Sequence, residues 1–163
     1  MENPALSGIS KFKEYTKKDV HDLVDPESGY YYYCGKWGIN GVIRIGKFKD
    51  DFVLFSTLGE NFKYHGKAQS IDKNGTVIWC APMSYRVGSR ELNDLLKKEP
   101  RKPGVFYFAR DGYKMDSDGV KKYYYIGQLI NPQIIDSKVP PLIIKWTLKD
   151  WDAQGIPKEL LLE

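Results

Sequence analysis

Alternation of apolar and polar residues is clearest in two segments near the C-terminus, Tyr123–Ile130 and Leu142–Leu148. In the second segment one row of side chains is wholly apolar, and it consists of Leu142, Ile144, Trp146 and Leu148. Successive side chains of a strand point to opposite faces, so this period of two predicts a pair of strands with a buried face. The connection between them, residues 131–141, is too long for a tight hairpin.

Further segments of the same kind lie upstream and predict more strands. β-branched and aromatic residues, which favour extended structure, dominate these segments. Asn74-Gly75 and Pro82 mark turns beside them. The predicted strands are Gly29–Trp37, Val42–Ile45, Asp51–Thr57, Thr76–Cys80 and Val105–Arg110.

Capping signals predict two short helices. The first begins at Thr16, with Asp19 in the position of a capping-box acid, and ends at the residue before Pro26. The second begins at Ser89, continues to residue 98 and turns its leucines to one side.

The order of these elements predicts an α+β fold in one domain. Its sheet is expected to be curved, mostly antiparallel and closed into a β-barrel, with the two short helices outside it. Residues 1–14 are interpreted as a flexible N-terminal arm and residues 15–150 as the domain. Residues 151–163 are interpreted as a C-terminal tail or a linker to a further domain.

Composition narrows the class of protein only a little. The chain has 163 residues, 14% of them aromatic, and a net charge of +4, which permits a nucleic-acid partner without requiring one. Two cysteines and two histidines are too few for a disulfide framework or a zinc site, so we expect no metal or cofactor. The start of the chain does not resemble a signal peptide, and no apolar run approaches ~20 residues. The expected location is therefore the cytoplasm, with no membrane partner.

Aromatic residues interleaved with cations form the strongest candidate site. Planar side chains can stack a base, while nearby cations hold the flanking phosphates. The competing interpretation is that these rings form the core. The predicted walls of a base pocket are Tyr31, Tyr33, Trp37, Trp79 and Tyr85, and the predicted phosphate ligands are Lys36, Arg44, Arg86 and Arg90.

Two other patterns suggest a nuclease. Gly104–Tyr107 followed by Tyr125–Gly127 resembles the signature of GIY-YIG nucleases, although the arginine which that family needs downstream is missing. Asp136-Ser-Lys138, with Asp116 or Asp118 upstream, has the spacing of a metal-dependent nuclease. The favoured interpretation of the first pattern is a buried strand with a glycine bulge, and that of the second is a set of solvated turns. No catalytic residue is assigned.

Short motifs follow one another along most of the chain in an order that resembles a known family. They are Tyr15–Val20, Val77–Trp79, Val105–Phe108, Tyr124–Gly127 and Pro141–Trp146. Together they look like the PUA-like domain found at the C-terminal end of bacterial restriction helicases and beside HNH nucleases. One segment departs from the family, because its polar Gln/Ser-rich stretch is replaced here by Cys80–Tyr85.

The resemblance implies a PUA-like or SRA-like barrel that recognises a modified base in double-stranded DNA, such as a methylated cytosine or adenine, by flipping it into an aromatic pocket. It also implies a non-enzymatic module of a modification-dependent restriction system in antiviral defence. Such a module confers target choice on a nuclease or an AAA+/helicase subunit or fused domain. The alternatives are an RNA-binding domain of the PUA class and a GIY-YIG-like nuclease.

Overall fold

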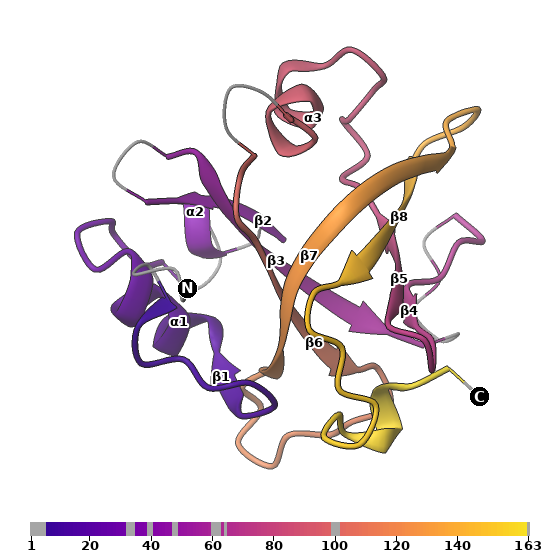
Figure 1. The fold of residues 1–163 in the computed structure, drawn as a ribbon. Coiled ribbons are helices and arrows are strands. Elements are labelled where there is room, and N and C mark those ends of the chain that lie inside the picture. The colour runs from indigo at the N-terminus through magenta and orange to yellow at the C-terminus, as the bar shows by residue number, and fades with distance from the viewer. Residues whose placement is uncertain are drawn as a thin grey trace.

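A large sheet with short helices around it makes up the protein (Figure 1). The computed structural model describes residues 6–31, 35–38, 41–46, 49–59, 63, 65–98 and 102–162. Its strands are β1 (Glu14–Thr16), β2 (Val42–Ile45), β3 (Asp51–Leu58), β4 (Ser70–Ile71), β5 (Thr76–Cys80), β6 (Val105–Asp111), β7 (Lys122–Asp136) and β8 (Ile143–Leu148). Its helices are α1 (Lys17–Val24), α2 (Gly35–Gly38) and α3 (Arg90–Leu95), with a 3-10 turn over Lys158–Leu160.

The sheet is mostly antiparallel, as the sequence predicts, but it is open. The strand order is β2-β3-β6-β7-β8-β5-β4, with β1 attached to β7, and β3 and β6 run parallel. β2 and β4 end this order, and within the described part of the chain no pairing joins them. The closed barrel was therefore a wrong prediction, while the mixed α and β class is confirmed.

One side chain spans the gap between β3 and β5, each of which is next to an end strand of the sheet. The Oε1 atom of Gln69 accepts hydrogen bonds from the Ser56 hydroxyl on β3 and from the backbone N–H of Cys80 on β5, each at 3.2 Å. The Nε2 atom of Gln69 donates to the Thr57 carbonyl on β3 at 3.4 Å. An amide thus replaces the missing strand pairing, and we call this opening, between β3 and β5, the seam.

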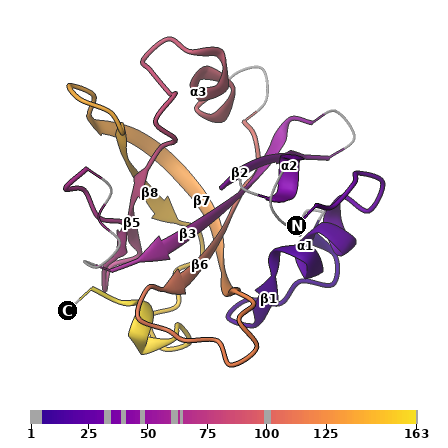
Figure 2. The same ribbon diagram turned by 180° about the vertical axis from the view of Figure 1, so that it is seen from behind.

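The two faces of the sheet bury separate cores, because neighbouring residues of each strand point to opposite sides. On β3, Phe52 and Leu54 belong to the first core, whereas Val53 and Phe55 belong to the second. The first core also receives Trp79, Trp146 and the buried leucines of α3. The second lies beside α1 and α2, which Figures 1 and 2 place at the β1 end of the sheet, away from β5 and β4.

The capping signals predict the first helix correctly and the second only in part. Thr16 and Asp19 form the complete capping box of α1, whose C-cap is Asp25. α3 begins after Ser89, but the Ser89 side chain makes no capping hydrogen bond and the helix ends at Leu95, before residue 98. α2 is a third helix that the sequence did not predict.

The prediction of a strand over residues 29–37 does not hold for the residues described within it, because residues 29–31 and 35–37 form no strand. Gly35 adopts a positive φ of 75° and begins the short helix α2, a conformation that glycine reaches without steric cost. Within this helix Trp37 is completely buried, and its indole N–H donates to Asp25 at 2.9 Å. Packing against the end of α1 therefore outweighs the strand preference of the neighbouring tyrosines.

The other strand predictions hold, with one correction to length. The apolar row from Leu142 to Leu148 is buried as predicted, while Lys145 and Thr147 are exposed. β7, however, continues through residues 131–136 and pairs with β8 along the way. The register shift between Ile130 and Gln133 absorbs Asn131 and Pro132 as a bulge, which is how a strand tolerates a proline.

The C-terminal residues pack on the body of the protein. Ile156 and Leu160 lie in the first core, and Leu161 forms a bridge with Ile71 of β4. None of the helices in the described ranges has the length and apolar character needed to cross a membrane.

Candidate nucleic-acid interface

A pocket of about 510 Å³ lies at the seam, where the sheet fails to close. Its lining comes from β2 and β3 on one side and from β5 with the loop that follows it on the other. We call it the seam pocket, and its lining residues are Gly41, Val42, Phe55, Gln69, Trp79, Cys80, Ala81, Pro82, Met83, Ser84 and Tyr85. It brings together two of the five aromatic residues predicted to form a base pocket, Trp79 and Tyr85.

The groups that line the seam pocket are neutral at physiological pH. Burial raises the pKa of the Cys80 thiol above its usual value, although Lys67 opposes the effect. Burial and the nearby Glu91 raise the pKa of the Tyr85 hydroxyl, and Arg44 opposes them. Cys80 is therefore a thiol and not a reactive thiolate. A pocket of this kind suits a neutral guest with both apolar and hydrogen-bonding edges.

Three of the four predicted phosphate ligands lie near Tyr85 and the start of α3. Arg86 is exposed and donates to the carbonyl oxygens of Met83 and Tyr85, which fixes the loop that lines the pocket. Arg44 pairs with Asp94 at 2.7 Å, and Arg90, 89% exposed, has its Nε 4.0 Å from the same carboxylate. Arg86 and Arg90 therefore present charge to solvent beside the pocket.

Three of the remaining predicted residues, Trp37, Lys36 and Tyr31, do not line the seam pocket. Trp37 is 0% exposed and packs in the second core, against Phe55 and His21, so its prediction as a pocket wall was wrong. The Lys36 ammonium donates to the Asp25 carboxylate at 2.9 Å. It therefore lies beside Trp37 and the second core, and not at the seam pocket. Tyr31 is 61% exposed and away from the pocket lining, and Tyr33 lies outside the described residues.

Sequence reasoning missed Gln69 and Phe55 as pocket residues. Gln69 lies in a polar segment that carries no periodic signal, and its importance comes from joining β3 to β5. Phe55 was predicted only as part of a strand. Both reach the pocket through contacts that are distant in sequence, so no local pattern could identify them.

The carboxylate of Asp25 is held in its ionised form. Burial raises its pKa, but hydrogen bonds from Trp37, Lys36, Ser28 and Lys49 together outweigh burial, and the pKa of this carboxyl lies well below its ordinary value. The Asp25 residue is 6% exposed. Lys36 and Lys49 are 32% and 50% exposed, and solvent therefore screens their part of the interaction.

Asp25→Asn is expected to lower the free energy of unfolding by about 1.5–3 kcal/mol at neutral pH, since it removes hydrogen bonds to a charged group. A carboxyl whose pKa is lower in the folded than in the unfolded protein gives stability above its unfolded pKa, about 4, and loses it as the pH falls toward the folded value. The gap between the wild type and the variant should therefore shrink below about pH 4. Urea unfolding across this range measures the gap, and a gap independent of pH would contradict the assignment.

The two tyrosines of the nuclease-like signature do not share a site. Tyr107 is completely buried in the first core, whereas Tyr125 packs against Phe108 on the side of the second core, with ring centroids 5.0 Å apart. Gly127 is buried in β7 with φ of 138°, opposite Tyr107 and next to a register shift. The interpretation of this motif as a buried strand with a glycine bulge is confirmed.

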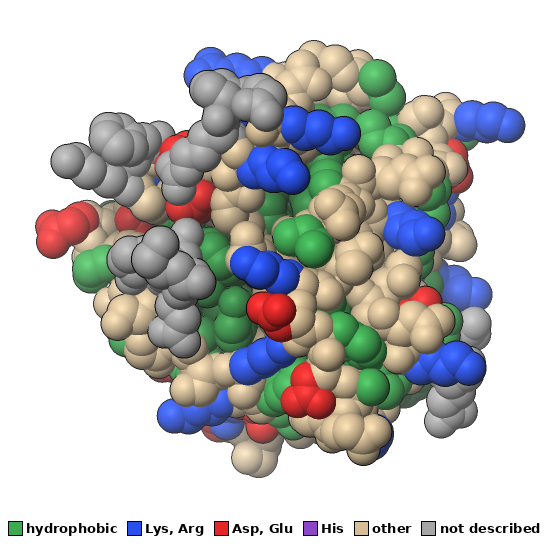
Figure 3. All heavy atoms as spheres, viewed as in Figure 1, with side chains coloured by type: hydrophobic (Ala, Val, Ile, Leu, Met, Phe, Trp, Pro, Cys, Tyr) green, Lys and Arg blue, Asp and Glu red, His purple; other side chains and the backbone are tan. Residues whose placement is uncertain are grey.

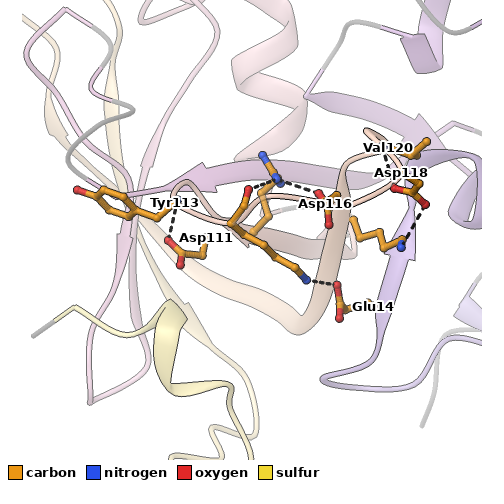
Figure 4. Close-up of polar contacts among 9 residues, drawn as sticks. Glu14, Asp111, Tyr113, Asp116, Asp118 and Val120 are labelled. Carbon is orange, nitrogen blue, oxygen red and sulfur yellow. Dashed lines mark hydrogen bonds and ion pairs between the residues drawn. The ribbon is translucent and has the colours of Figure 1, made fainter.

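The carboxylates of the second nuclease-like pattern have structural partners. Asp116 pairs with Arg110 at 3.0 Å and Asp118 caps the backbone N–H of Val120, as Figure 4 shows. Asp136 accepts from the backbone N–H of Lys138 and lies 3.3 Å from the Lys67 ammonium. In the described ranges no group of three His, Cys, Asp or Glu side chains could hold a metal ion.

The chain matches no protein-family model, and the comparison with curated proteins finds no match. The geometry of the seam pocket and its surroundings is thus the basis for inferring a function.

Proposed function

We propose that the chain is a non-catalytic DNA-binding module that takes a modified base into the seam pocket. The observation that carries the proposal is that Trp79 and Tyr85 meet in one pocket at the seam, with the exposed Arg86 on the adjoining loop. The pocket's volume, about 510 Å³, lies within the range of roughly 300–1,000 Å³ typical of small-ligand sites. The curved sheet is compatible with the PUA-like or SRA-like domain that the sequence resembles.

A neutral base would gain more in this pocket than an ion. The pocket offers the apolar side chains of Val42, Phe55 and Met83 together with hydroxyl and thiol groups. Trp79 and Tyr85 are 2% and 8% exposed, so a base can stack on them only if one of these rings shifts to uncover its face. Stacking then contributes about 1–3 kcal/mol per base, which offsets much of the few kcal/mol that flipping costs. A methyl group buried on the apolar side adds about 0.8 kcal/mol, or close to a fourfold preference over the unmodified base.

Phosphate contacts would come from arginines outside the pocket. Arg86 and Arg90 are exposed beside it, and Arg44 reaches the same region from β2 through its pair with Asp94. Arginine binds phosphate through a planar fork, and such contacts position the duplex without reading its sequence. On this proposal the target is chosen by the pocket, and cleavage belongs to a nuclease or helicase partner.

Ser84→Trp and Arg90→Ala separate the two parts of the site. Ser84 is exposed and lines the pocket, so Ser84→Trp should fill the pocket and abolish the preference for a methylated duplex while leaving binding to plain DNA. Arg90→Ala should weaken binding to both duplexes equally and lower the slope of log affinity against log salt by about one. Fluorescence anisotropy with labelled duplexes, methylated at cytosine or adenine or left plain, measures both effects at two salt concentrations.

Lys121→Ala, an exposed lysine outside the pocket, serves as the matched control and should change neither quantity. Thermal unfolding of each variant checks that the fold is retained. Equal affinity of the wild type for methylated and plain duplexes would refute modified-base recognition. Tighter binding of a single-stranded RNA of the same sequence would instead favour the RNA-binding alternative.

A further inference from the structure

The C-terminal half of β7 has an open edge. The last residue of β7 that pairs with β6 is Gln128, opposite Phe106, yet β7 continues to Asp136 with β8 on its other side. No residue in the described ranges pairs with β7 beyond Gln128 on the β6 side. Figure 1 shows this part of β7 extending past the start of β6, toward α3. Unpaired N–H and C=O groups on such an edge can accept another strand.

A cleft of about 780 Å³ lies between this edge and the end of α3, and we call it the α3–β7 cleft. It has an aliphatic lining, which consists of Leu95 of α3, the C-cap residue Leu96, Val105 of β6, and Leu129 and Ile130 of β7. The seam pocket shares no lining residue with it. It therefore provides space for alternate apolar side chains next to a free strand edge.

Lysines surround the α3–β7 cleft. Lys97, Lys98, Lys102 and Lys149 line it, and none of the described residues that line it is acidic. The space-filling view of Figure 3 shows Lys and Arg side chains around a hydrophobic strip between α3 and β7. This distribution of charge favours an anionic occupant, since an uncompensated group of like charges raises the local concentration of the opposite sign.

Trp146 supplies a second reason to expect an occupant. Its side chain lines the cleft, is 1% exposed, and carries an indole N–H with no hydrogen-bond partner. A buried donor without a partner costs free energy, so an acceptor entering the cleft would relieve that cost. The backbone carbonyls of an added strand lie in the plane of the sheet, so the acceptor would be an oxygen of a side chain that projects from the strand into the cleft.

The lining favours a peptide over a nucleic-acid strand. Single-stranded nucleic acids bind by stacking on exposed aromatic faces. Among the described residues that line the cleft, Trp146 alone is aromatic, and it is buried. A free strand edge with aliphatic pockets is instead the arrangement that binds an added strand. We propose that the α3–β7 cleft binds an extended segment of a partner protein, with alternating acidic and aliphatic residues, as an extra strand along β7.

The test uses the full chain and an array of peptides that alternate Asp or Glu with Leu, Ile or Val. The best binder is then labelled and measured by fluorescence anisotropy. Lys98→Glu together with Lys102→Glu should weaken its binding by at least about tenfold. Lys73→Glu with Lys121→Glu, the same charge change at exposed positions outside the cleft, should leave it within about twofold.

Two further measurements distinguish strand addition from simple charge attraction. The backbone amide of Ile134, which the pairing register turns toward the open edge, should exchange more slowly with deuterium in the presence of the peptide, whereas that of Gln133, which faces Lys145 of β8, should not change. A peptide with proline in its centre should bind at least about tenfold more weakly, because it cannot donate to the edge. Equal binding of the proline peptide, no change in exchange, or no binder in the array would each overturn the proposal.

A labelled single-stranded oligonucleotide, measured alongside, separates the two kinds of partner. If the oligonucleotide displaces the peptide, and if Lys98→Glu with Lys102→Glu weakens its binding by at least about tenfold, the cleft binds the phosphates of a nucleic acid. The peptide proposal would then be wrong. The Lys98 and Lys102 variants retain every residue of the seam pocket, so a failure here leaves the modified-base proposal untouched.

Discussion

Trp37→Ala is expected to lower the free energy of unfolding by about 3–5 kcal/mol, the usual cost of removing a buried Trp or Phe side chain. Trp37 is completely buried between Phe55 and His21. Its truncation would also leave Asp25 without the indole donor that helps keep it ionised. Urea unfolding followed by circular dichroism at neutral pH measures the change.

Tyr31→Ala is the matched control for Trp37→Ala. Tyr31 is also aromatic and was also predicted to form the base pocket, but it is 61% exposed. Its truncation should change stability by no more than about 0.5 kcal/mol. If Trp37→Ala left stability unchanged and abolished selective DNA binding, Trp37 would be a pocket wall and the core assignment would be wrong.

The apolar row of β8 shows where sequence reasoning succeeds, because alternation fixes which face of a strand is buried. On β3 and β6 nearly every position is buried, so alternation alone does not distinguish their two faces. It cannot separate an aromatic residue in the core from one in a pocket, since both environments select the same residue types. Trp79 belongs to both environments, because it packs against Trp146 in the first core and also lines the seam pocket.

The errors in the predicted fold come from contacts that are distant in sequence. The bond from Trp37 to Asp25 determines α2, and Gln69 links β3 to β5. The pairing of β7 with β8 continues past Pro132 because the bulge removes the need for its missing N–H. In each case a local signal is outweighed by tertiary structure.

The sequence predicted only the part of the candidate site that is local in the chain, because the rest depends on contacts between residues distant in sequence. Tyr85 and Arg86 follow β5 directly, so their position beside Trp79 could be inferred from the chain itself. The opposite wall comes from β2 and β3, whose position across the seam depends on the strand order. Trp37, which lies in another element, was grouped with the pocket, but it packs against Phe55 of the lining and does not itself line the pocket.

Asp116→Ala is expected to destabilise the protein by about 3–5 kcal/mol, because it would leave the charge of Arg110 buried without a partner. The two side chains are 5% and 7% exposed and lie 3.0 Å apart. Arg110 already has one buried nitrogen, Nε, without a hydrogen bond. Among the described residues, the Lys114 carbonyl is the acceptor that remains for its guanidinium once Asp116 is gone. Urea unfolding at neutral pH measures the loss.

Asp118→Ala, in the same loop, is the control. Its carboxylate is largely exposed and serves a backbone N–H at the surface (Figure 4), so the unfolding midpoint should stay close to that of the wild type. Replacing Arg110 and Asp116 together by leucine should recover much of the lost stability, since an apolar pair carries no desolvation cost. If the double variant were as unstable as Asp116→Ala alone, packing of the loop would be the cause, and not the unpaired charge.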